Sequence, residues 1–180
     1  MRSQRARDTG RLRVTCVDWR EDRIGSARRG ENPTVLAELD AGYAVIGDVQ
    51  FLPGYCVLLG TDPAATSLAE MPRIERVRFL ADADLLATAV ERACRDLVPG
   101  FRRVNIEVLG NADAFVHAHV WPRYSWEPPG LVARPVWLHP AERWQDPATG
   151  LGDAHDELRA RIRDELRELA RDEAVEVRAR

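Results

Sequence analysis

The stretch that decides the fold is Phe115-Val116-His117-Ala118-His119-Val120-Trp121, which Pro122 and Arg123 follow. Side chains of a β-strand alternate between its two faces. One face of this segment is therefore wholly apolar and belongs to a core; it consists of Val116, Ala118 and Val120. The other face carries two imidazoles, separated by two strand rises of about 7 Å in total. We predict a strand over residues 114–120, with His117 and His119 on its polar side and Pro122 ending it.

The two histidines are suited to more than one kind of chemistry. The pKa of imidazole is ordinarily about 6.5, so one ring can attack as a neutral nucleophile while its protonated neighbour steadies phosphate charge or protonates a leaving oxygen. The pair also suits zinc, with further ligands from His139, His155 or an acidic residue. The sequence contains no HxHxDH or HExxH pattern to supply them. By itself the pair leaves a catalytic, a metal-binding and a structural interpretation open.

Short apolar runs on the N-terminal side of this segment predict more of the same sheet. The runs 35–39 and 43–46 are separated by Asp40-Ala41-Gly42, which is typical of a hairpin. A third strand is expected over 55–59, after the Pro53-Gly54 turn. A further short strand or entry segment is expected over 12–17.

Helical periodicity appears twice. Within residues 73–98, apolar side chains recur at helical spacing up to the Pro99-Gly100 stop, and a strand over 103–109 follows. Residues 153–175 form a charged helix with a narrow apolar stripe, either a partner contact or a surface helix packed on its own domain. Between them, residues 124–148 are rich in Pro and Trp and have no steady period. The fold class is α+β: an antiparallel sheet of about five strands, one long helix packed on it, and a C-terminal helix.

Composition excludes several classes of protein. The chain has 180 residues, a formal net charge of −3, and 26 basic residues, every one of them arginine. It has no global field to attract nucleic acid, so a phosphate ligand needs a local site. The three cysteines are scattered, which indicates reduced, mostly buried thiols in a cytoplasmic protein. We find neither a membrane span nor a signal peptide.

The segment from Asn105 to Arg123 resembles the signature of the histidine triad family, His-φ-His-φ-His-φ-φ, often followed by Pro-Arg. The Pro-Arg pair sets the register: His119 matches the third motif histidine, His117 the middle one, and Phe115 occupies the place of the first. The segment from Thr34 to Tyr55 is similar to the family's first hairpin. The resemblance covers about residues 16–123 and favours the branch that hydrolyses diadenosine polyphosphates.

The resemblance implies roles for named residues. His117 would attack the α-phosphorus and form a nucleotidyl-histidine intermediate, and His119 would contact the phosphate or the leaving group. Asn105 and Asn111 would donate to phosphate oxygens. On the substrate side, the resemblance also implies Asp48 and Gln50 near the ribose, and Arg123 beside phosphate charge.

We therefore expect a flexible N-terminus over 1–11, a histidine-triad-like domain over 12–148 and a helical extension over 149–180. The expected function is hydrolysis or nucleotidyl transfer at the α-phosphate of nucleotides, dinucleoside polyphosphates or phosphoramidates. The alternatives are a non-catalytic nucleotide-binding protein and a zinc-dependent hydrolase. The expected partners are a nucleotide, with no nucleic acid or membrane, and a second copy in a homodimer. No cofactor is expected beyond a divalent cation that accompanies the nucleotide.

Overall fold

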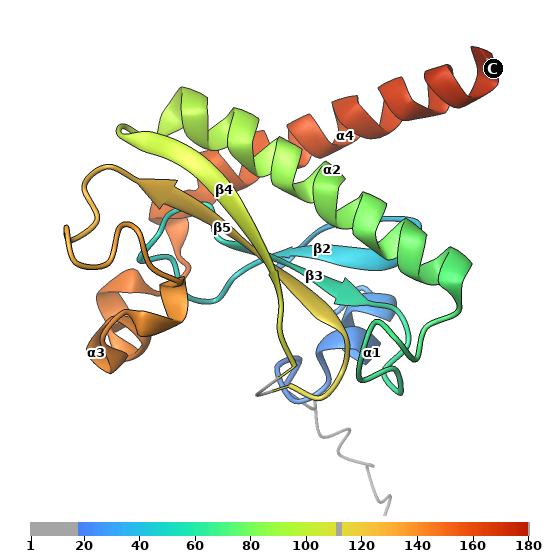
Figure 1. The fold of residues 1–180 in the computed structure, drawn as a ribbon, viewed down its shortest axis with the longest axis horizontal. Helices are drawn as coiled ribbons and strands as arrows, with labels where there is room; N and C mark the ends of the chain where they lie inside the picture. The colour runs from blue at the N-terminus through green and yellow to red at the C-terminus, as the bar shows by residue number, and fades with distance from the viewer. Residues whose placement is uncertain (1–17, 111–112, 180) are drawn as a thin grey trace, which may run out of the picture.

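The computed structural model describes residues 18–110 and 113–179, and it contains one antiparallel five-stranded sheet (Figure 1). The strand order is β1-β2-β3-β5-β4. The strands are β1 (Val35–Glu38), β2 (Gly42–Ile46), β3 (Cys56–Gly60), β4 (Phe101–Val108) and β5 (His117–Tyr124). The predicted hairpin, third strand and α+β class are confirmed. The segment predicted over 12–17 and the N-terminal residues 1–11 lie outside the described residues.

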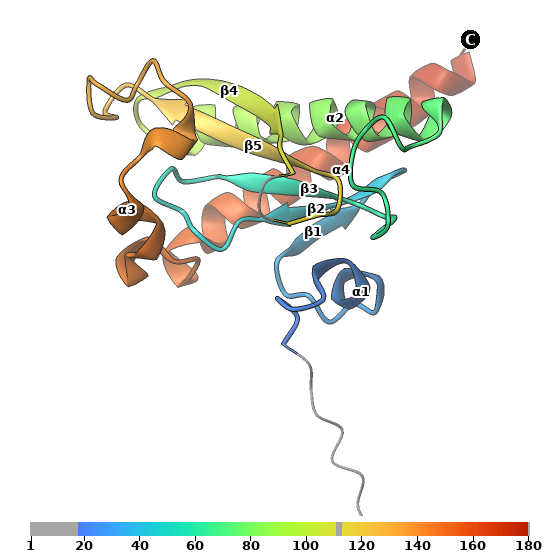
Figure 2. The ribbon, with the colours of Figure 1, turned by 60° about the horizontal axis from the view of Figure 1, so that its bottom comes forward.

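Helices cover both sides of the sheet, as Figure 2 shows. The long helix α2 (Arg73–Leu97) packs along one face, and α4 (Asp156–Ala179) packs against α2. The short helices α1 (Arg23–Arg28) and α3 (Ala141–Gln145) lie on the other side. Single 3₁₀ turns occur at 136–138, 147–149 and 153–155. The sheet therefore has one face closed by long helices and one face that only short segments cover.

The apolar face of β5 lies in the core, as its alternation predicts. Val116, Ala118 and Val120 are buried in one cluster with residues of α2, which include Phe79 and Leu86. Because this face is fixed against α2, the alternate residues His117 and His119 must point to the opposite side of the sheet. Packing of the core thus determines where the two imidazoles lie.

The prediction that Pro122 ends the strand is wrong, because β5 continues to Tyr124. Strand β3 pairs with β5 only as far as Val120, so beyond that residue β5 has a partner on one side alone, β4. Proline lacks an N–H group and is tolerated where a strand is an edge. The extension carries Arg123 and Tyr124 into the interior.

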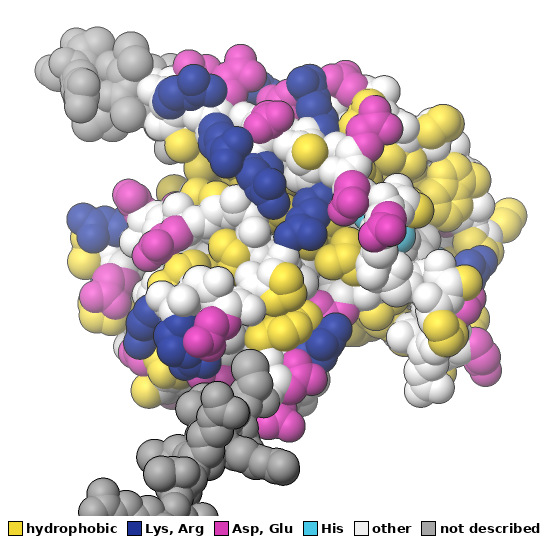
Figure 3. Space-filling model, turned by 180° about the vertical axis from the view of Figure 1, so that it is seen from behind, with side chains coloured by type: hydrophobic (Ala, Val, Ile, Leu, Met, Phe, Trp, Pro, Cys, Tyr) yellow, Lys and Arg dark blue, Asp and Glu magenta, His cyan; other side chains and the backbone are white. Residues whose placement is uncertain are grey.

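Helix α4 belongs to the same core. Its stripe residues Leu158, Ile162 and Leu166 are buried in the cluster that α2 and the sheet form. Its outer side is crowded with arginine and acidic side chains (Figure 3). The stripe therefore packs on its own domain, which is the second of the two interpretations of this helix.

The helices and the cysteines indicate whether the described residues contain a membrane span or a disulfide bond. Within the described stretches of the chain, no helix is long and apolar enough to cross a membrane. Cys56 and Cys94 are free and buried, and burial raises the pKa of both thiols. The third cysteine, Cys16, lies outside the described residues, and the cytoplasmic location stays a prediction.

Candidate active site

His117 and His119 lie together in a pocket on the less covered face of the sheet. They are 6% and 8% exposed, and their ring centroids are 4.8 Å apart with the ring planes at 82°. The pocket has a volume of about 180 Å³, and the turn after β2, which includes Asp48, lines its wall. The two imidazoles are close enough to contact one small group, such as a phosphate.

The hydrogen bond of His117 fixes its tautomer. Its Nδ1 lies 2.8 Å from the carbonyl oxygen of Phe115. A carbonyl oxygen only accepts, so Nδ1 carries the proton. The lone pair of the neutral ring is then on Nε2, which is the nitrogen available to attack an electrophile.

His119 has a different partner. Its Nδ1 lies 2.8 Å from the hydroxyl oxygen of Tyr55. Burial, with a smaller contribution from the neighbouring His117, lowers the pKa of His119 to about 4. Burial raises the pKa of Tyr55, which therefore stays a neutral phenol. When this hydroxyl donates to Nδ1, the proton of His119 is on Nε2, so the two histidines have opposite tautomers.

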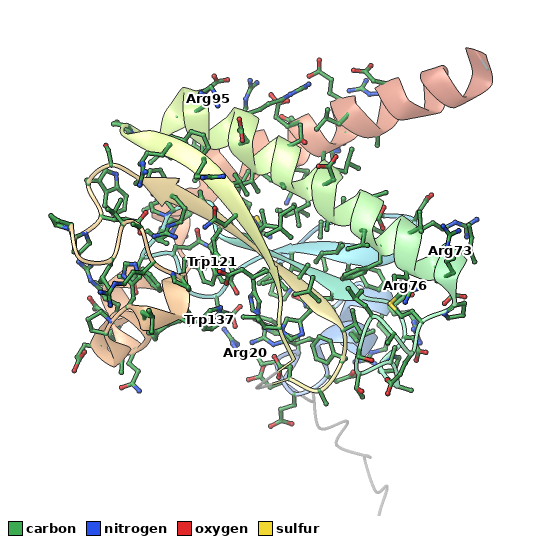
Figure 4. The ribbon with its side chains drawn as sticks, in the orientation of Figure 1. Arg20, Arg73, Arg76, Arg95, Trp121 and Trp137 are labelled. Carbon is green, nitrogen blue, oxygen red and sulfur yellow. The ribbon has the colours of Figure 1, made fainter. Side chains whose placement is uncertain are left out.

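Aromatic rings cover His119. Trp137 meets it edge to face at 4.8 Å, and Trp144 stacks parallel to Trp137 at 4.9 Å. On the sheet itself, Tyr55 stacks on Trp121 at 3.5 Å. Figure 4 labels Trp121 and Trp137, which come from β5 and from the loop after it. The sequence shows this loop only as an aperiodic segment rich in Trp and Pro, so the role of Trp137 and Trp144 was missed.

Asp48 is placed in the pocket wall, where its carboxylate is paired. Oδ2 accepts from Arg23 at 2.8 Å, and Arg20 lies 3.8 Å away. The guanidinium of Arg20 in turn lies over the ring of Trp19. Asp48 is therefore within reach of a ligand. Arg23, which the sequence analysis did not identify, lies beside it.

Gln50 is buried beneath this turn and does not line the pocket. Its Nε2 donates to the carbonyl oxygens of Gly47 and Tyr55, and its Oε1 accepts from the N–H of Gly54. Gly54 has φ of +89°, a conformation that favours glycine. In this structure the Gln50 amide is used to hold the turn that presents Asp48 and Tyr55.

Arg123 is not brought to the pocket either. Its guanidinium is buried and forms a forked ion pair with Glu127 at 2.8 to 3.1 Å, and it also donates to the carbonyl of Arg134. His139 Nε2 lies 3.3 Å from the same carboxylate, and burial is the main cause that lowers the pKa of His139. These contacts tie the ends of the loop that carries Trp137. The arginine is thus engaged in holding that loop over His119.

Neither of the two predicted asparagines, Asn105 and Asn111, is found in the histidine pocket among the described residues. Asn105 lies on β4 directly opposite Trp121, so it shares the face of the histidines, but it lines a neighbouring cavity and not the histidine pocket. Asn111 lies outside the described residues. Asp113 and Phe115 also line the histidine pocket.

Zinc binding would need a larger donor set than the two histidines. In residues 18–110 and 113–179, no group of three or more His, Cys, Asp or Glu side chains is arranged to hold a metal ion. His139, one of the ligands that the zinc interpretation requires, is bound to Glu127 in the loop. Among the described residues, His117 and His119 therefore lack the third side-chain ligand that the zinc interpretation requires.

Comparisons with known proteins identify the fold. No family model and no curated protein matches the chain. Solved structures do: a histidine triad protein from Sinorhizobium meliloti 1021 has a TM-score of 0.60 at 19% identity, over 77% of this chain and 93% of that one. One from Marinobacter aquaeolei VT8 has a TM-score of 0.58 at 20% identity, over 75% and 89%. A hypothetical histidine triad nucleotide-binding protein from Sulfolobus tokodaii strain 7 has a TM-score of 0.56 at 13% identity, over 81% and 91%. The chain has the fold of histidine triad proteins.

The indole of Trp137, which packs on His119, should help to keep the pKa of that histidine low. Removing the indole in Trp137→Ala admits water to the imidazole, so the pKa of His119 should rise from about 4 toward its ordinary value of about 6.5. The measurement is a histidine titration followed by NMR. Trp126→Ala is the matched control, because Trp126 is half exposed and stacks on Tyr124. An unchanged His119 titration in Trp137→Ala would show that the burial has another source.

Proposed function

We propose that this chain is a nucleotide hydrolase or nucleotidyl transferase in which His117 attacks the α-phosphorus. The observation that carries the proposal is the hydrogen bond from His117 Nδ1 to the Phe115 carbonyl, which leaves the Nε2 lone pair free in a pocket beside a second imidazole. Attack by an activated side chain divides one difficult displacement into two easier steps. The fold also supports a nucleotide ligand, since the similar Sulfolobus tokodaii protein is described as nucleotide-binding.

In the first step, the Nε2 lone pair of His117 forms a bond to phosphorus, and the bond from phosphorus to the leaving oxygen breaks. The ring then bears a positive charge, with phosphorus on Nε2 and the proton still on Nδ1. The carbonyl of Phe115, 2.8 Å from Nδ1, stabilises that charge as a preorganised acceptor. The leaving oxygen takes the electron pair of the broken bond.

In the second step, water or another hydroxyl attacks phosphorus, and the bond from phosphorus to Nε2 breaks. The electron pair returns to Nε2, so His117 is restored as a neutral ring. The proton lost by the attacking water passes to solvent. The products are a nucleoside monophosphate, or its ester with the acceptor, and the leaving group.

His119 contributes a hydrogen bond and not a proton transfer. With its pKa at about 4, the ring is neutral at physiological pH. Its Nε2–H can donate to a phosphate oxygen, but a neutral imidazole is a poor acid. A leaving group that departs as a stable anion, such as a phosphate chain, suits this site better than an amine, which must be protonated as it leaves. We therefore place polyphosphates and dinucleoside polyphosphates ahead of phosphoramidates.

The first experiment is to trap the intermediate. Wild-type protein and a panel of labelled adenine and guanine polyphosphates should give a nucleotidyl adduct that mass spectrometry maps to His117. His117→Ala should lose turnover by several orders of magnitude. His155→Ala is the control, since His155 bonds only to Gly152 among the described residues.

Two outcomes would favour the alternatives. Binding without any adduct or turnover would indicate a non-catalytic nucleotide-binding protein. Activity that is lost on chelation and restored by zinc would indicate a zinc-dependent hydrolase. Attack by His117 predicts unchanged turnover with a metal-free substrate after chelation.

We also propose that two copies pair through β4. This strand is an edge of the sheet, and unpaired edge groups are a template for another strand. Ile106 and Val108 on β4 are 44% and 37% exposed, and Ile74, Val77 and Leu80 on α2 are exposed as well. An isologous antiparallel pairing would cover these apolar side chains.

Oligomeric state tests this pairing. Sedimentation should give the mass of a dimer for wild-type protein and for Leu138→Glu, which alters an exposed leucine outside β4 and α2. Ile106→Glu should shift the equilibrium toward monomer, because it places two carboxylates in the apolar contact. A wild-type protein that is monomeric at all concentrations would contradict the pairing.

A further inference from the structure

A second cavity lies on the same face of the sheet as the histidines. It has a volume of about 430 Å³ and is lined by Arg102, Arg103, Asn105, Glu107 and Arg134, among others. We call it the β4 cavity. In the ladder between β4 and β5, Asn105 lies opposite Trp121 and Glu107 lies opposite His119. Residues that face one another across a ladder share a face, so the β4 cavity continues the surface that carries the active site.

The charge of the β4 cavity is positive. Its lining contains four guanidinium groups, of Arg102, Arg103, Arg123 and Arg134, and one carboxylate, of Glu107. Arg123 is paired with Glu127, which leaves three guanidinium groups against the carboxylate. Among the described residues, Arg102, Arg103 and Arg134 take part in no ion pair. The histidine pocket differs, since Arg23 is paired with Asp48 and Asp113 adds a further carboxylate there. The surplus of positive charge that would attract a polyanionic substrate therefore lies in the β4 cavity and not in the histidine pocket.

Trp137 joins the two sites. Its ring lies 4.8 Å from His119, and its Nε1 donates to Oε2 of Glu107 at 2.8 Å. The indole is 42% exposed, so it offers free apolar surface between the reacting centre and the arginines. The indole therefore contacts one residue of each site, His119 and Glu107.

We propose that the β4 cavity binds the phosphate groups of the leaving group, with Arg103 and Arg134 as the anion ligands and Asn105 as an additional donor. The inference rests on the proposed function and names the substrate class of that site: nucleotides whose leaving group carries phosphate. Guanidinium groups match phosphate oxygens with paired N–H donors. Asn105, which does not line the histidine pocket, acquires a role here.

Binding measurements separate this site from the α-phosphate site. The probes are a nucleoside monophosphate, inorganic tripolyphosphate, and a dinucleoside tetraphosphate with methylene bridges in place of the bridging oxygens, each nucleotide in adenine and guanine forms. Calorimetry should show that Arg103→Gln and Arg134→Gln each weaken binding of the bridged analogue about tenfold, the effect of one charged hydrogen bond. Binding of the monophosphate should not change. Arg73→Gln is the control, because Arg73 lies at the far end of α2 (Figure 4).

The other outcomes are also decisive. If tripolyphosphate competes with the analogue, the phosphate chain is the recognised group. If the analogue binds far more tightly than tripolyphosphate, the second nucleoside contributes part of the binding free energy. Both results support the β4 cavity. Equal affinity of the analogue for wild type, Arg103→Gln and Arg134→Gln overturns the inference, and His117 labelling would still stand. A wild-type protein that binds no nucleotide and gives no His117 adduct contradicts the proposed function itself.

Discussion

The hydrogen bond from Nδ1 of His117 to the carbonyl oxygen of Phe115 determines which ring nitrogen faces the pocket with a lone pair. It depends on the start of β5, because the carbonyl belongs to the residue two positions before the histidine. The direction of the ring depends in turn on Ala118 and Val120, which are fixed in the core against α2. The free lone pair on Nε2 is thus a consequence of strand alternation and core packing.

The loop after β5 adds a second constraint. The buried pair of Arg123 and Glu127 fastens this loop, and the loop carries Trp137 over His119. Truncation of either partner would leave an unpaired buried charge, which is strongly destabilising. Burial lowers the pKa of His119 to about 4, so the ring is neutral at physiological pH. In the proposed reaction, a neutral His119 would favour leaving groups that need no proton. Under the two proposals, Trp137 and the arginines of the β4 cavity would favour the same substrates, those whose leaving group carries phosphate.

The sequence was sufficient for the sheet, for both long helices and for the face that His117 and His119 share, because periodicity records which side of an element is buried. It was insufficient where one side chain has two plausible partners. Gln50 and Arg123 were expected at the ribose and the phosphate, yet their polar atoms bond to the turn at Gly54 and to Glu127. Neither partner follows from spacing, since the contacts form only after the chain folds. Trp137 lies in a segment without a period, so its position over His119 required the structure.

The most direct measurement is the tautomeric state of the two rings, read from ¹⁵N chemical shifts of the imidazole nitrogens at neutral pH. Attack by His117 predicts a proton on its Nδ1 and a bare Nε2, with the reverse arrangement in His119. Tyr55→Phe should in addition perturb His119 alone, because the tyrosine hydroxyl bonds only to that ring among the described residues. A proton on Nε2 of His117 would leave no lone pair facing the pocket and would contradict His117 as the nucleophile.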